Sequence, residues 1–202
     1  MKPLSEHARR VAAEAVRRRV EVELEAIAEL ARLNPERLRL LGIREAAGRI
    51  LALAVVLRAR TSVLPGPGSE PELRDEEVRA ELVVERYPDA QPKVCLASRA
   101  PLFLPGVAAF GPIHGEFAGV PCLFRGPWDP ERMDLPFLVR QVHAALIAEP
   151  AVLNAPADCL NQRAALHFLE RRAELPLDAP LVTLAEATPP APRRRRFAAE
   201  VR

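Results

Sequence analysis

Three cysteines are the residues of this chain best suited to nucleophilic chemistry. Cys122 directly follows a stretch rich in Gly and Pro, 99–121. Cys95 falls in an apolar run, and Cys159 lies next to the start of a predicted helix. Their odd number argues against a disulfide framework, and their spacing is not that of a metal site. A free thiolate is nucleophilic near neutral pH, and its thioesters stay reactive towards amines. Cys122 is therefore the candidate nucleophile, and a core cysteine at a strand end is the alternative.

His114 lies in the same irregular stretch as Cys122. A Cys–His pair would suit a cysteine hydrolase, because the imidazole can take the proton of the thiol. Such a site also needs an Asp or Asn that orients the histidine, and a preformed oxyanion hole. The sequence places neither of these parts, and a solvated surface histidine is the alternative interpretation of His114.

Length and composition are those of a globular chain. Its 202 residues suffice for one domain with a core and are too few for two ordinary domains. Hydrophobic residues make up 49% and aromatic residues only 4%, so Leu, Val and Ala must fill the core. With 29 basic and 27 acidic residues the net charge is +2, which argues against a general nucleic-acid binder. No run reaches the ~18 apolar residues of a membrane span, and no apolar signal core is present, so we expect a cytoplasmic protein.

The N-terminal part of the chain has the pattern of a long amphipathic helix. Ser5 can cap a helix that runs to about Leu33, with its apolar residues on one face. Asn34-Pro35 ends this helix and can start a short second helix through Leu41.

The middle of the chain predicts an antiparallel sheet. The apolar run 50–57 suits either a strand or a helix that starts near Arg44, whereas alternation over 78–85 and the apolar run 94–97 indicate strands. The loop Pro65–Ser69 joins the first two of these three segments. Cys95 would then lie in the core, within the third strand.

Helices are predicted again towards the C-terminus. Apolar residues at helical spacing indicate helices over 135–147 and 160–173. Leu166 and Leu169 are core candidates of the second helix. The sequence therefore divides into an N-terminal helix (1–34), a central domain (35–176) and a tail (177–202).

The tail is rich in Pro and Arg. Its end reads Pro189-Pro190-Ala191-Pro192 and then Arg193-Arg194-Arg195-Arg196, which cannot bury a core. We expect this segment to be mobile and solvated, with docking on an acidic partner as the alternative.

Four motifs in order resemble the catalytic half of the ubiquitin-conjugating enzyme family. That family carries Tyr-Pro-x-x-x-Pro-Lys-Val, then Cys-Leu, then Trp-x-Pro before a helix. The matching segments here are Tyr87–Val94, Pro121-Cys122-Leu123, Trp128-Asp129-Pro130 and Leu160–Ala165. The resemblance covers roughly Ile50 to Arg172 and favours a strand over 50–57. It implies an α+β fold, with an antiparallel sheet of about four strands, an N-terminal helix and C-terminal helices packed on the sheet.

The resemblance also implies a function. Cys122 would accept a ubiquitin-like protein from an adenylating activating enzyme as a thioester and pass it to an amine of an acceptor protein. No metal or organic cofactor is implied, because the activating enzyme spends the ATP. The family orients and desolvates the incoming lysine with a polar residue at the position of Asp158. The alternative for Asp158 is an ordinary cap of the following helix.

The chain departs from the family just upstream of the nucleophile. Leu104-Pro105-Gly106 stands where the family has His-Pro-Asn, so the Asn that supports the oxyanion is missing. The segment from Gly106 to Cys122 is also longer than usual, and His114 within it could supply the lost donor. Such divergence is similar to bacterial members of the family, several of which are thought to act in defence against phage. A non-catalytic binding module of the same fold, which holds a ubiquitin-like protein or its activating enzyme, is the main alternative.

Overall fold

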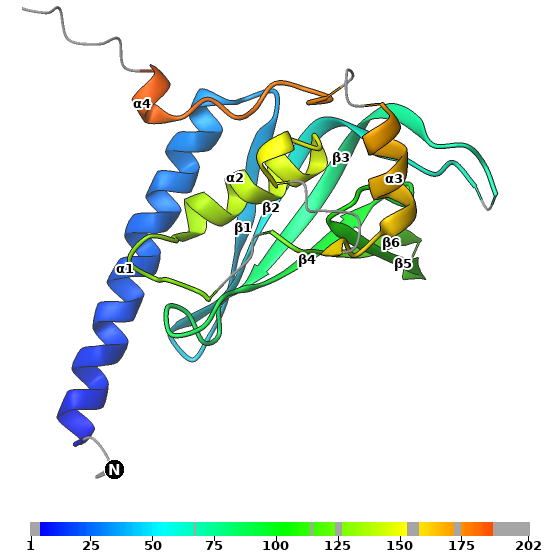
Figure 1. Cartoon of the computed structure of the whole chain (residues 1–202). Helices are drawn as coiled ribbons and strands as arrows, with labels where there is room; N and C mark the ends of the chain where they lie inside the picture. Colours follow the sequence, from blue (N-terminus) through cyan, green and yellow to red (C-terminus); the bar gives the residue numbers. More distant parts are fainter. Residues whose placement is uncertain are drawn as a thin grey trace, which may run out of the picture.

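The computed structural model describes residues 5–66, 68–113, 115–123, 127–152, 158–171 and 175–187. The architecture is α+β, with one open antiparallel sheet and helices from both ends of the chain (Figure 1). The helices are α1 (Glu6–Leu33), α2 (Leu135–Leu146), η1 (Pro150–Val152), α3 (Gln162–Glu170) and α4 (Leu184–Ala187). None of the helices in these ranges is long and apolar enough to cross a membrane.

The sheet has six strands, where about four were expected. They are β1 (Leu38–Ala46), β2 (Arg49–Val63), β3 (Glu72–Val83), β4 (Lys93–Ser98), β5 (Val107–Ile113) and β6 (Glu116–Pro121). Their order across the sheet is β1-β2-β3-β4-β6-β5, and all neighbours are antiparallel. The predicted strands around 50–57, 78–85 and 94–97 are confirmed as β2, β3 and β4.

Helix α1 begins where the sequence predicted. The hydroxyl of Ser5 accepts a hydrogen bond from the amide of Ala8, which satisfies one donor of the first turn. The helix buries Ile27 completely and Val20 and Leu30 almost completely. This apolar stripe packs on β1, β2 and α2, which makes α1 part of the main core.

The prediction of a short helix through Leu41 is wrong, because this segment is part of β1. Leu38 lies opposite Leu57 of β2, and Leu40 lies opposite Val55. Pairing with a long neighbouring strand supplies main-chain hydrogen bonds and packing that a single helical turn could not.

Strands β5 and β6 come from the stretch that was predicted to be irregular. Gly119 of β6 lies against β5, since a Cβ there would be 3.1 Å from a methyl carbon of Val107. Pro112 lies in β5, which is an edge strand, and an edge tolerates a residue that has no amide hydrogen. The glycines and the proline therefore fit a hairpin at the border of the sheet.

Two predicted core assignments are wrong. Cys95 is exposed, because Val94 and Leu96 take the inward positions of β4 and the strand alternates. On α3, Leu166 and Leu169 are exposed. The face that packs inward instead contains Ala164, Ala165 and Phe168.

The C-terminal segment 175–187 packs against the domain, so the packed part of the chain extends past residue 176. The side-chain amide of Asn34 donates to the carbonyl of Val182 (2.9 Å), and its oxygen accepts from the Val182 amide (2.8 Å). Arg37 pairs with Asp178 (3.1 Å), and Leu181 is only 5% exposed. The remainder of the tail, 188–202, lies outside the described residues.

Candidate functional site

Cys122 directly follows the last residue of β6. Its amide donates to the carbonyl of Gly106 at 2.7 Å, which fixes its backbone, and its side chain is half-buried. Pro121 and Leu123 on either side are buried. A Cβ at position 106 would lie 3.4 Å from the carbonyl oxygen of Cys122, so glycine suits this close approach. The strand end thus holds the backbone of Cys122 and leaves its thiol partly accessible.

A neighbouring carbonyl ties the start of α3 to the same segment. The Pro105 carbonyl accepts a hydrogen bond from the amide of Asn161 at 3.1 Å, next to the Gly106 carbonyl that holds Cys122. Two consecutive carbonyls therefore bring together two segments that are far apart in the sequence, Cys122 and the residues that precede α3. Asp158 and Cys159 belong to the second of these segments.

Phe103 secures α3 in this position. Its ring is buried, with only 2% of the residue exposed. The guanidinium carbon of Arg163 lies 5.6 Å from the ring centre, and the ring of His167 meets it edge-on at 5.7 Å. A cation–π contact and an aromatic pair, both from α3, stabilise this packing.

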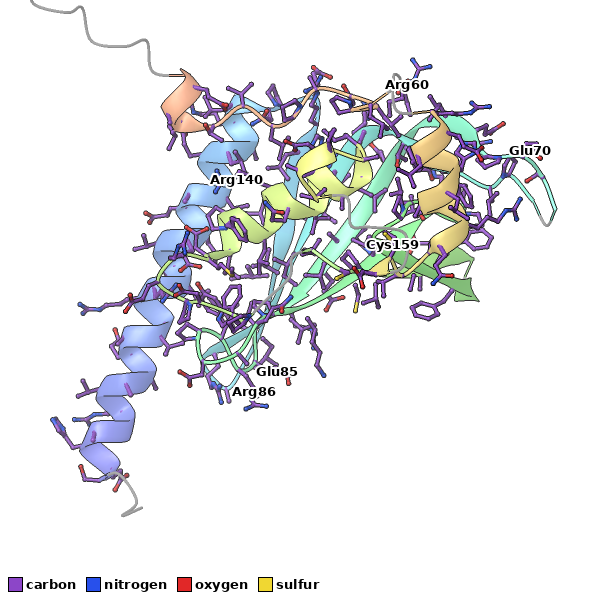
Figure 2. The ribbon with its side chains drawn as sticks, viewed as in Figure 1. Arg60, Glu70, Glu85, Arg86, Arg140 and Cys159 are labelled. Carbon is purple, nitrogen blue, oxygen red and sulfur yellow. The ribbon has the colours of Figure 1, made fainter. Side chains whose placement is uncertain are left out.

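Asp158 is exposed, and it is not the cap of α3. Asn161 has that role, since its side-chain oxygen accepts from the amide of Ala164 at 3.0 Å. The helix-cap interpretation of Asp158 is therefore wrong for this helix. Cys159 beside it is half-buried (Figure 2).

His114 lies outside the described residues, as do residues 124–126 just after Leu123. The contact between His114 and Cys122 thus remains a prediction from the sequence.

The Tyr87-Pro88 and Trp128-Asp129-Pro130 motifs meet in the structure. The indole nitrogen of Trp128 donates to the carbonyl of Pro88 at 2.7 Å. The rings of Tyr87 and Trp128 pack edge to face, with their centres 6.0 Å apart. The chain that follows Cys122 is therefore fixed to the loop that precedes β4.

Glu23 of α1 is a buried carboxylate beneath this contact, and the sequence analysis missed it. It is 8% exposed, and it accepts hydrogen bonds from the Tyr87 hydroxyl (2.5 Å) and the Leu135 amide (3.0 Å). Arg19 pairs with Glu23 at 2.7 Å and also donates to the carbonyl of Pro130. Burial and the Glu23 carboxylate raise the pKa of Tyr87, so the phenol keeps its proton and donates.

The sequence did contain a signal for Glu23. It lies three residues after Val20 and four before Ile27, on the buried stripe of α1. A carboxylate on such a stripe requires partners, because burying it alone would be costly.

Chemically, the site offers a half-buried cysteine, an exposed carboxylate on a tethered segment and a firmly held loop. Within the ranges that the structure describes, no three or more His, Cys, Asp or Glu side chains form a group that could hold a metal ion. Gly106 brings no side-chain donor to the loop that supports Cys122.

Comparisons with protein-family models, with curated proteins and with solved structures found no match to this chain.

Proposed function

We propose that this protein is a conjugating enzyme for a ubiquitin-like protein, which it carries as a thioester on Cys122. The observation that supports this most is the paired tether at Pro105 and Gly106. It places an accessible cysteine and the exposed Asp158 on segments held by neighbouring carbonyls. Thioester transfer to an amine needs a nucleophile and a group that handles the incoming amine.

The fold supports the same proposal. An N-terminal helix, an antiparallel sheet and C-terminal helices follow the order expected for a conjugating enzyme. The chain would be a divergent member, because its sheet has six strands and its loop has Gly106 in place of the family's Asn.

The reaction has two steps. The Cys122 thiolate attacks the activated carboxyl carbon of the cargo, and the activating group leaves as the thioester forms. A neutral amine of the acceptor then attacks the thioester carbon and releases the thiolate, while the extra proton of the amine is lost. Asp158 would orient the amine and accept a proton from it, so that the amine attacks in its neutral form.

The biological setting is part of the proposal and rests on the resemblance. Bacterial relatives of the family work with an adenylating enzyme and a ubiquitin-like protein, several of them in defence against phage. We propose the same kind of partners here, with an acceptor protein that receives the cargo in the last step of the transfer.

One observation favours a second candidate, a binding module of the same fold that holds a ubiquitin-like protein or its activating enzyme without chemistry. Gly106 provides no amide donor where the family stabilises the oxyanion. Loss of such a donor costs on the order of 10²–10³-fold in other acyl-transfer enzymes.

A discharge assay separates the two candidates. The protein is loaded with its ubiquitin-like partner by the activating enzyme and ATP, loading is stopped, and free lysine is added. An enzyme loses the thioester and yields a lysine adduct of the cargo. A binding module co-elutes with the partner on gel filtration and forms no thioester under these conditions.

A further inference from the structure

Strand β1 is an open edge of the sheet. It pairs with β2 on one side, and in the described part of the chain no strand pairs with its other side. Residues 41–46 are all exposed. Figure 1 shows β1 at the border of the sheet beside α1. An uncovered edge presents unpaired amide and carbonyl groups to any second strand that fits them.

This edge also carries two exposed apolar side chains. Leu41 is 48% exposed and Ile43 is 45% exposed. Both line an open groove of about 270 Å³ together with Gly42, three residues of β2 (Ala52, Leu53 and Ala54) and the ion pair of Arg44 with Glu81. Leu41 has no partner in β2, because the ladder shifts between Leu40 and Gly42. Two large apolar side chains on one short edge are typical of a strand that joins another.

We propose that two copies of this chain associate through β1, antiparallel, with Gly42 on the two-fold axis. In this register Arg39 lies opposite Glu45 of the second copy, and Leu41 lies opposite Ile43 of the second copy. The symmetry repeats each pair, so the interface contains two ion pairs and two apolar pairs. Among the described residues neither Arg39 nor Glu45 forms an ion pair within 4.0 Å, and the carboxylate of Glu45 acts on Arg17 of α1 only over a longer distance.

The charges select this register over its neighbours. A slip by one residue in one direction places Arg39 opposite Arg44 of the second copy, which is a repulsive pair. A slip in the other direction places Glu45 opposite Leu40. Since side chains directly opposite each other on paired strands interact most strongly, only the register centred on Gly42 satisfies both charges.

The other edge of the sheet is less suited to pairing. Strand β5 contains Gly111 and Pro112, and proline both removes a donor and protects a sheet edge. Strand β1 contains no proline over Leu38–Ala46. Proline thus protects the β5 edge, whereas the β1 edge has no proline and is interrupted by shifts between Leu40 and Gly42 and between Arg44 and Glu45.

The test is the oligomeric state of the full chain, by sedimentation velocity from about 1 to 100 µM, a range suited to a small interface. We expect a concentration-dependent species of twice the 22.3 kDa of one chain. Arg39→Glu and Glu45→Arg should each weaken association about tenfold, because each places like charges opposite one another. The double variant Arg39→Glu/Glu45→Arg should restore it. Glu70→Arg, an equal charge change on the distant β2–β3 loop in Figure 2, should leave it unchanged.

Hydrogen exchange gives a second readout on the same protein. Amides of β1 should become more protected as the concentration rises, while those of β5 should not. A chain that stays monomeric over the whole range would overturn the proposal. So would a dimer that both single variants leave intact, or a dimer whose β1 amides exchange as fast as those of the monomer. None of these measurements needs a ubiquitin-like partner, so they stand apart from the proposed function.

Discussion

A single carboxylate, that of Glu23, joins helix α1 to both loops that flank the candidate site. It accepts hydrogen bonds from Tyr87 and from the amide of Leu135, and it pairs with Arg19. Arg19 is one helical turn away from Glu23, whereas Tyr87 and Leu135 are distant from it in the sequence. The positions of the loop before β4 and of the start of α2 therefore depend on a residue of the N-terminal helix.

Glu23→Ala should lower the free energy of unfolding by about 3 kcal/mol, because it leaves buried donors without an acceptor. Glu23→Gln keeps an acceptor oxygen and should cost clearly less. Urea unfolding of both variants measures the difference. If the free energy of unfolding of Glu23→Ala equals that of the wild type, the hydrogen bonds of Glu23 do not hold these loops.

His143 is a buried histidine on α2 with a low pKa. It is 1% exposed, and its Nε2 has no hydrogen-bond partner among the described residues. Burial lowers its pKa to about 4 from 6.5, with Arg37 acting in the same direction and Asp178 opposing. In the unfolded chain the imidazole binds a proton more readily than in the folded chain.

This difference makes stability fall as the pH drops from 6.5 towards 4. Between about pH 7 and pH 4.5, the wild type should lose about 2 kcal/mol more than His143→Leu, which has no proton to bind. Urea unfolding at the two pH values gives both losses. Equal losses in the two proteins would mean that His143 is not the group responsible.

Asp158 belongs to the second step of the proposed reaction. Asp158→Ala should load from the activating enzyme normally but transfer its cargo to lysine about tenfold more slowly. Raising the pH should narrow this gap, because a larger share of the lysine is then already neutral. Asn161→Ala is the matched structural control, since it removes the cap of α3 and should cost about 1 kcal/mol of stability. A slow discharge that high pH does not relieve would argue against this role.

Among the elements, those with a clear local pattern were predictable. The cap and stripe of α1, the apolar face of α2 and the alternation in β3 appear directly in the sequence. Strand β1 was missed because Leu38 and Leu40 gain their partners from β2, a contact that no local pattern shows. Strands β5 and β6 were missed because Gly111, Pro112 and Gly119 are usual in loops and fit here only at the border of the sheet.

The candidate site was also predictable only in part, because some of its contacts join segments that are distant in the sequence. Cys122 and Asp158 were selected from the sequence, but the carbonyls of Pro105 and Gly106 that tether their segments could not be foreseen. On α3 the sequence has apolar residues on two faces, and only packing against the rest of the domain decides that Phe168 and not Leu166 lies inward. Glu23 was passed over because carboxylates on helices are usually solvated.

The C-terminal segment tests the extent of the folded part. Ending the chain at Ala187 should leave the thermal midpoint almost unchanged, because the Pro- and Arg-rich remainder cannot form a packed element. Ending it at Leu177 removes the Asn34–Val182 hydrogen bonds, the Arg37–Asp178 pair and the buried Leu181. This shorter chain should lose more than about 2 kcal/mol. Equal midpoints for the two truncations would show that segment 178–187 does not stabilise the domain.

At the scale of the whole molecule, one sheet carries both Cys122 and the loop before β4. Its β6 end holds Cys122, and the loop before β4 meets the chain that follows Cys122 through Trp128 and Pro88. Helix α1 supports the contact between Trp128 and the Tyr87-Pro88 loop through Glu23. Asp158 lies in the segment that precedes α3. The fold therefore connects segments that span most of the sequence through a few specific hydrogen bonds.

The central claim is that Cys122 carries the cargo. The most direct measurement mixes the protein with its activating enzyme, ATP and ubiquitin-like partner, and compares gels with and without reductant. Wild type, Cys95→Ala and Cys159→Ala should each show an adduct that reductant removes, because thiols exchange with a thioester. Cys122→Ala should show none, and Cys122→Ser should show an adduct that resists reductant, because an alkoxide is a poorer leaving group. An adduct that persists in Cys122→Ala would contradict the claim.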